Sequence, residues 1–147
     1  MLIATALVTV GLLALFTGFQ YATSGVAAGG GETAAVFLAE QRVEQLRAQA
    51  TLDFSAPVLA AGTVREYCVA GHTADGGGSA CQDTPPAGLV YTRTTTITDL
   101  TADAGCPATP LSCKQIEVRV SYHPVTTTGT LDQSRSVDVV TVLGPRA

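Results

Sequence analysis

The hydrophobic positions divide the chain into an uninterrupted apolar beginning and a patterned remainder. No charged residue occurs from Met1 to Gly31, and the first is Glu32. The opening stretch, MLIATALVTVGLLALFTGF, is long enough as a helix to span a hydrocarbon core of about 30 Å. It therefore predicts a membrane-spanning helix within residues 1–28. A cleaved secretory signal is the competing interpretation, but it favours a basic start and a small-residue cleavage motif, and the first basic residue is Arg42.

A segment of helical period follows at residues 32–50, ETAAVFLAEQRVEQLRAQA. Its apolar residues step by three and four, which predicts an amphipathic helix continuous with the first. We expect one face of this helix, marked by Val36, Val43 and Leu46, to form the seam with the rest of the domain. Three consecutive glycines, each costing about 1 kcal/mol against Ala in a helix, predict a kinked or melted stretch near Ser24–Gly31.

The remainder of the chain has the composition of β-structure. Val, Ile, Thr and Tyr are enriched in four segments, Gly62–Gly71, Leu89–Leu100, Lys114–His123 and Ser136–Leu143. The third alternates apolar and polar residues, as a strand with one buried face does. Residues 124–133 are expected to form the hairpin loop before the last strand. The pattern predicts an α+β fold, with a head at 29–147 in which an antiparallel sheet of about four strands (62–143) packs on the amphipathic helix.

Four cysteines lie in the polar part of the chain, at Cys68, Cys81, Cys106 and Cys113. An even count at short spacing among loops rich in Gly and Pro indicates two disulfides, which form outside the reducing cytoplasm. Three pairings are possible. We expect the local one, Cys68 with Cys81 and Cys106 with Cys113, because each pair brackets a short loop.

Composition argues against several function classes. The chain carries eight basic and twelve acidic residues, a net charge of −4, and a single lysine, which disfavours nucleic-acid binding. Ser79 is not in a nucleophile motif. The histidines are His72 and His123; His72 has helical spacing to Cys68, but Cys68 lies in a strand pattern and fits a disulfide better than a zinc site. Loop aspartates that could offer oxygens to calcium, Asp75, Asp83, Asp99 and Asp103, form no tight cluster. We expect no cofactor, no metal site and no enzymatic activity.

An apolar helix running into an amphipathic half that ends LAEQRVEQLRA resembles the long first helix of type IV pilins. The chain is most similar to minor pilins of the pilus-modification type and to minor pseudopilins of type II secretion. Members of that family begin their mature chain with F-T/S-L-I-E, which this sequence lacks. Met1 to Ala4 matches the residues that come after that glutamate in the family, so the chain would lack its leader and first mature residues. In the alternative register, Met1 is the mature N-terminus and Thr5 takes the place of the glutamate.

The resemblance implies a pilin-like fold and a structural role in a filament. The subunit would wait in the inner membrane with its head outside the cytoplasm, and the assembly platform would then transfer its helix from lipid into the filament core. Small residues, Gly11, Ala14 and Gly18, would pack there against other subunits, although glycine is also common in membrane helices. The partners expected are other pilin or pseudopilin subunits and lipid. A single-pass, membrane-anchored extracytoplasmic binding domain outside any filament is the alternative, and a cleaved, secreted binding domain is a third possibility.

Overall fold

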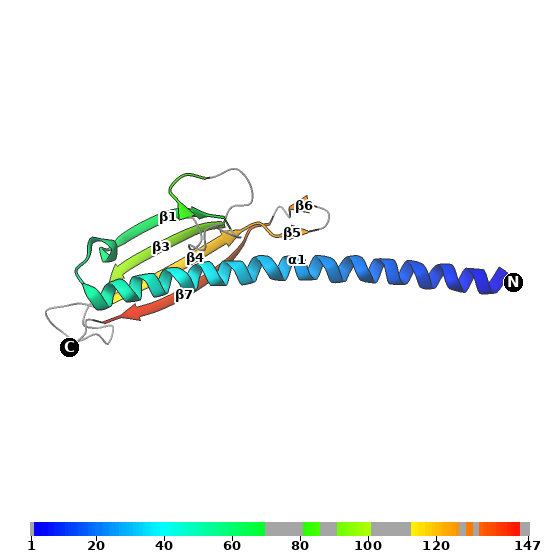
Figure 1. Cartoon of the computed structure of the whole chain (residues 1–147), viewed down its shortest axis with the longest axis horizontal. Helices are drawn as coiled ribbons and strands as arrows, with labels where there is room; N and C mark the ends of the chain where they lie inside the picture. Colours follow the sequence, from blue (N-terminus) through cyan, green and yellow to red (C-terminus); the bar gives the residue numbers. More distant parts are fainter. Residues whose placement is uncertain are drawn as a thin grey trace.

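The computed structural model describes residues 2–69, 81–85, 91–100, 113–126, 129–130 and 133–144; within these, side chains are described except at 2–9, 20–21, 24–28, 125–126 and 129–130. The chain begins with one helix of 51 residues, α1 (Leu2–Leu52), and a 3₁₀ turn, η1 (Pro57–Leu59), follows it. All strands come afterwards. The C-terminal half of α1 lies on a sheet, and its N-terminal half projects beyond the sheet (Figure 1).

The strands form a five-stranded antiparallel sheet of order β2-β1-β3-β4-β7. Its members are β1 (Gly62–Cys68), β2 (Cys81–Gln82), β3 (Tyr91–Asp99), β4 (Lys114–Tyr122) and β7 (Arg135–Leu143). The expectation of an α+β fold with an antiparallel sheet is confirmed. The four expected strands are present, and β2 is an additional two-residue strand. Between β4 and β7, β5 (Val125–Thr126) pairs with β6 (Gly129–Thr130) in a small ribbon.

Alternation along the strands divides the sheet into a covered and an open face. On β4, Ile116, Val118 and Val120 are fully buried, whereas Arg119 between them is exposed. Helix α1 covers this buried face, mainly over β4 and β7. The open face carries hydroxyl and charged side chains, because its residues on β1, β3 and β4 are mostly Thr, Ser, Arg and Glu. The head therefore has one core, between α1 and one face of the sheet.

The side chains that the helix contributes to this core differ in part from those expected at the seam. Val43 and Leu46 are buried, with 4% and 1% of their surfaces exposed. Val36 is half-buried and is not a member of the core cluster, so its place in the seam stays a prediction. Ala35 and Leu38 also lie in the core. Val36 lies about 20° around the helix from the buried Val43, at the margin of the covered face.

The glycine run does not interrupt the helix, and the expected melting near Ser24–Gly31 is wrong. Helix α1 continues through these residues without a break. A methyl group at Gly31 would lie 3.0 Å from Cε2 of Tyr122, whose ring stacks on Tyr91 with 5.5 Å between centroids. Glycine at this position thus lets the helix approach the two stacked rings. This packing outweighs the helix-propensity cost of glycine, as tertiary contacts commonly do.

The end of α1 is closed by the polar residues that follow it. The carboxylate of Asp53 accepts hydrogen bonds from the backbone N–H of Ser55, at 2.9 Å, and from its hydroxyl, at 2.6 Å. These bonds favour the charged form and lower the pKa of Asp53 below its ordinary value. The turn directs the chain through η1 into β1, so that Leu59 reaches the core.

Candidate functional site

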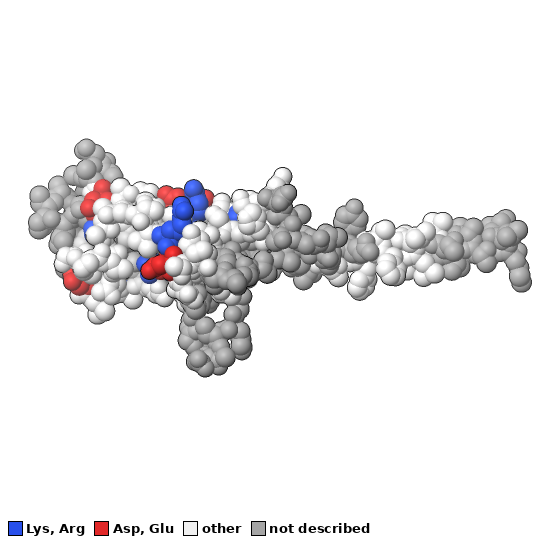
Figure 2. Space-filling model, turned by 90° about the horizontal axis from the view of Figure 1, so that it is seen from above, with Lys and Arg blue, Asp and Glu red and all other residues white. Residues whose placement is uncertain are grey.

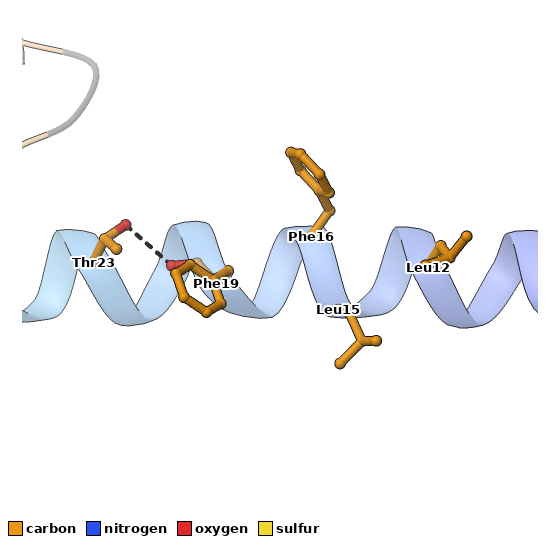
Figure 3. Close-up of a pocket in the computed structure, with 5 residues that line it drawn as sticks. All are labelled: Leu12, Leu15, Phe16, Phe19 and Thr23. Carbon is orange, nitrogen blue, oxygen red and sulfur yellow. Dashed lines mark hydrogen bonds between the residues drawn. The ribbon is translucent and has the colours of Figure 1, made fainter.

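The projecting half of α1 exposes large apolar side chains. Leu12, Leu13, Phe16 and Phe19 are 59%, 67%, 72% and 77% exposed, respectively. They are not confined to one stripe: Leu12, Leu15, Phe16 and Phe19 line one side of the helix (Figure 3), whereas Val10, which is 65% exposed, lies on the side opposite Phe19. A helix that is apolar all round is stable when other apolar material surrounds it. This part of the chain is therefore a surface that needs a partner.

Small residues lie among these apolar side chains. Gly11, Ala14 and Gly18 are exposed on the projecting half, and a methyl group at Gly11 or Gly18 would meet no atom within 4 Å. At 100° per residue the three fall within about 60° of one another on one helix face. This side of the helix therefore has a strip without large side chains, along which another helix could pack closely. Their packing role stays a prediction.

Charge is confined to the other end of the molecule. Figure 2 shows Lys, Arg, Asp and Glu side chains over the head and none on the described atoms of the projecting half. Within the described part of the chain, no helical stretch is both long and apolar enough to cross a membrane.

A buried ion cluster joins the helix to the sheet. The guanidinium of Arg93, on the covered face of β3, donates to one oxygen of Glu66 on β1 through Nε at 3.0 Å and Nη2 at 2.9 Å. It also donates to the main-chain carbonyl of Leu38 in α1 at 3.2 Å. The Arg42 Nε atom lies 3.8 Å from the same carboxylate oxygen, Oε2. The cluster thus connects α1, β1 and β3 through side chains buried in the interface.

The electrostatics of this cluster are set by burial. Only 4% of the Arg93 side chain and 16% of each of its charged neighbours are exposed. Burial lowers the pKa of the Arg93 guanidinium, Glu66 raises it, and Arg42 lowers it further. Two cations face one anion, and the Nε atom of Arg42 makes no hydrogen bond within the described residues. Loss of the single carboxylate would leave two arginines without a counter-ion in the interface.

One of the two expected disulfides is confirmed in the described residues, and it joins two strands of the sheet. Cys68 and Cys81 are bonded and also pair across β1 and β2. Cys113 is disulfide-bonded as well, while its expected partner Cys106 lies outside the described residues. The Leu100 N–H, just after β3, donates to the carbonyl of Cys113, just before β4, at 2.8 Å.

The candidate side chains that the structure describes are not brought together in one site. Lys114 pairs with Asp99 at 2.7 Å, and among the described residues no group of three metal-ligating side chains occurs. Asp83 lies just after β2, apart from Asp99 at the end of β3. Three other candidates, His72, Asp75 and Asp103, and the loop residue Ser79 lie outside the described residues.

Comparison with known proteins adds no relative. The chain matches no family model, no curated protein and no solved structure at a significant level.

Proposed function

We propose that this chain is a structural, non-enzymatic subunit of a type IV pilus or type II secretion filament, of the minor pilin or pseudopilin kind. In this proposal the projecting half of α1 lies in the inner membrane before assembly and in the filament core afterwards. The head lies outside the cytoplasm and presents its sheet and loops.

One observation carries the proposal: the apolar half of α1 extends out of a head that carries the charged residues and a disulfide. At 1.5 Å per residue, residues 2–28 of the helix measure about 40 Å, more than the ~30 Å of a hydrocarbon core. This proposed span includes residues 2–9, 20–21 and 24–28, whose side chains are outside the described part. Lipid and a helix bundle are both apolar, so one surface suits both environments.

The disulfides support the orientation. A bridge between Cys68 and Cys81 favours an oxidising compartment for the head. The N-terminal half has no charged residue that would set its direction by the positive-inside rule. The head therefore determines the proposed topology.

Cell fractionation tests the proposal. The chain is expressed with a C-terminal tag in its native host cell. We expect it in the membrane fraction and in filaments, either sheared from the cell surface or assembled in the periplasm. The double change Leu13→Asp and Phe16→Asp should remove it from both, because a charged residue at the centre of a membrane helix costs about 2.5–3.5 kcal/mol. The change Gln45→Asp, on the exposed side of the helix, is the matched control and should leave membrane insertion unchanged.

Other outcomes have distinct meanings. A chain that stays in the membrane and never enters filaments would support an anchored binding domain instead. A soluble chain whose N-terminus begins near residues 20–25 would show a cleaved signal. Either result would contradict the filament proposal.

A further inference from the structure

The strand β7 ends the sheet on one side and has an open edge. Its nine residues pair with β4 along their whole length, from Lys114 opposite Leu143 to Tyr122 opposite Arg135. In the part of the chain that the structure describes, no strand pairs with the other side of β7. An edge strand leaves a row of backbone N–H and C=O groups directed away from the sheet, and such a row is a template for another strand.

The side chains of β7 resemble those of an interior strand. On the covered face, Val137 and Val139 are half-buried and pack against the core. On the open face, Val140 and Val142 are 57% and 54% exposed. A strand with one solvated face normally alternates apolar and polar residues, whereas apolar residues on both faces are typical of a strand whose two faces are both covered. Val140 and Val142 therefore form an exposed apolar pair directly beside the open edge, which a further strand could cover in part.

The opposite edge of the sheet is protected, whereas β7 is not. The short strand β2 covers Tyr67 and Cys68 of β1, and the rest of the β1 edge carries Arg65 and Glu66. Charged residues, prolines and short strands are the usual means of preventing unwanted pairing. In contrast, β7 has neither proline nor lysine, and its two charged residues are Arg135 at its first position and Asp138.

We propose that β7 binds an extended segment of a different polypeptide, which adds to the sheet as a sixth strand. Backbone groups of β7 supply the hydrogen bonds, and β-branched or apolar side chains of the partner cover Val140 and Val142. The partner carries a basic residue opposite Asp138. That residue would extend the alternation of charge across the strands, where Arg119 of β4 already donates to Asp138 at 2.6 Å.

If the proposed function holds, a second copy of this chain cannot pair its own β7 with this edge. Helix α1 and β7 run in the same direction (Figure 1). Antiparallel pairing of two copies would therefore send their projecting halves to opposite ends, away from a shared membrane. Parallel pairing through the same edge would turn one sheet over and join the open face of one copy to the helix-covered face of the other.

The test uses the full chain in detergent micelles and a synthetic nine-residue probe peptide. The probe alternates Val and Thr and carries one Lys placed opposite Asp138 in antiparallel register. Binding is measured by fluorescence anisotropy of the labelled probe, and protection of β7 by hydrogen exchange. We expect binding with slower exchange in β7, and about tenfold weaker binding for a probe with Glu in place of Lys, a difference of about 1.4 kcal/mol.

Two double variants locate the contact. Val140→Lys with Val142→Lys places charge on the open face beside the edge and should weaken probe binding at least about tenfold. Thr63→Lys with Thr98→Lys adds the same charge to exposed positions of the same face on β1 and β3, and should leave binding unchanged. All four positions are exposed, so both variants are expected to fold, which their thermal melts check.

Three results would overturn the proposal. The probe could bind equally well to both double variants. The β7 amides that point away from β4 could be protected in the free chain at all concentrations, which would mean that the chain covers its own edge. Protection could instead rise with chain concentration without probe, which would assign the edge to a second copy. None of these depends on filament assembly, so failure here is distinguishable from failure of the proposed function.

Discussion

The buried cluster of Glu66, Arg93 and Arg42 makes a quantitative prediction about what holds the helix to the sheet. Replacing Glu66 with Ala removes both side-chain bonds of Arg93, at 3.0 and 2.9 Å, and the only anion near Arg42 among the described residues. Arg93 is 4% exposed and cannot reach water without opening the seam. Removing one partner of a buried ion pair in this way costs about 3–5 kcal/mol.

The reverse change should cost less. Replacing Arg93 with Met leaves Glu66, which is 16% exposed, with Arg42 still 3.8 Å away. We expect a loss of about 1–3 kcal/mol from the lost bonds to Glu66 and to the Leu38 carbonyl. The double variant should lose less than the sum of the single variants, with a coupling energy of about 1–3 kcal/mol, because the second change removes the charge that the first leaves unpaired.

The measurement is urea unfolding of the chain from Glu32 onward, whose core residues all lie at Ala35 or later. Near-ultraviolet circular dichroism of the stacked Tyr91 and Tyr122 reports the tertiary structure. Glu44→Ala is the control: its bond to Arg47 is short, 2.7 Å, but both side chains are about half exposed or more, so the loss should stay within about 0.5 kcal/mol. Equal losses for Glu66→Ala and Glu44→Ala, or additive single effects, would refute the reasoning.

Two further predictions concern single residues of the seam. In the full chain in micelles, Gly30→Ala should raise the free energy of unfolding by up to about 1 kcal/mol, because a methyl group there would meet no atom within 4 Å. Gly31→Ala should give no gain or a loss, because overpacking against Tyr122 costs about 1–3 kcal/mol. Equal gains at both positions in thermal melts would contradict the contact between Gly31 and Tyr122. In the chain from Glu32 onward, Thr95→Val should raise the free energy of unfolding by about 1 kcal/mol, because the Thr95 hydroxyl is buried without a partner within the described residues. The control, Thr94→Val on the open face, should change the free energy of unfolding little in the same urea titration.

The strands were predictable because their signal is local. Alternation from Gln115 to Tyr122 defines which face of β4 is buried, and Pro124 together with Gly129 predicts a turn before β7. The short strand β2 has no such signal. It consists of Cys81 and Gln82, and it is paired to β1 beside a disulfide rather than by its own composition.

The seam was harder to predict, since two rotations of the helix fit the same spacing. Stripes beginning at Ala35 and at Val36 both step by three and four, and only the packed sheet distinguishes them. Position 38 is a leucine in a segment that also places Phe37 beside it, and the structure buries Leu38 while leaving Phe37 61% exposed. Side-chain size alone would have selected the wrong residue.

The ion cluster could have been anticipated in part from alternation. In the segment from residue 91 to residue 99, Arg93 shares its face with Tyr91, Thr95 and Ile97, which marks an inward-facing charge. The partner could not be identified in the same way. Glu66 lies opposite Arg93 only in the register of β1 and β3, and the number of residues between these two strands gives no information on that pairing.

The contacts at the seam also connect the two proposals. Gly31 brings α1 against Tyr122 near the point where the helix leaves the sheet, and Arg93 binds the Leu38 carbonyl two turns further on. A helix held at two successive places and unbroken between them fixes the direction of its projecting half relative to the strands. The open edge of β7 then keeps one orientation relative to that half. If the projecting half enters a filament core, a strand added to β7 lies alongside the filament axis, so the partner must approach the head from the side rather than from its tip.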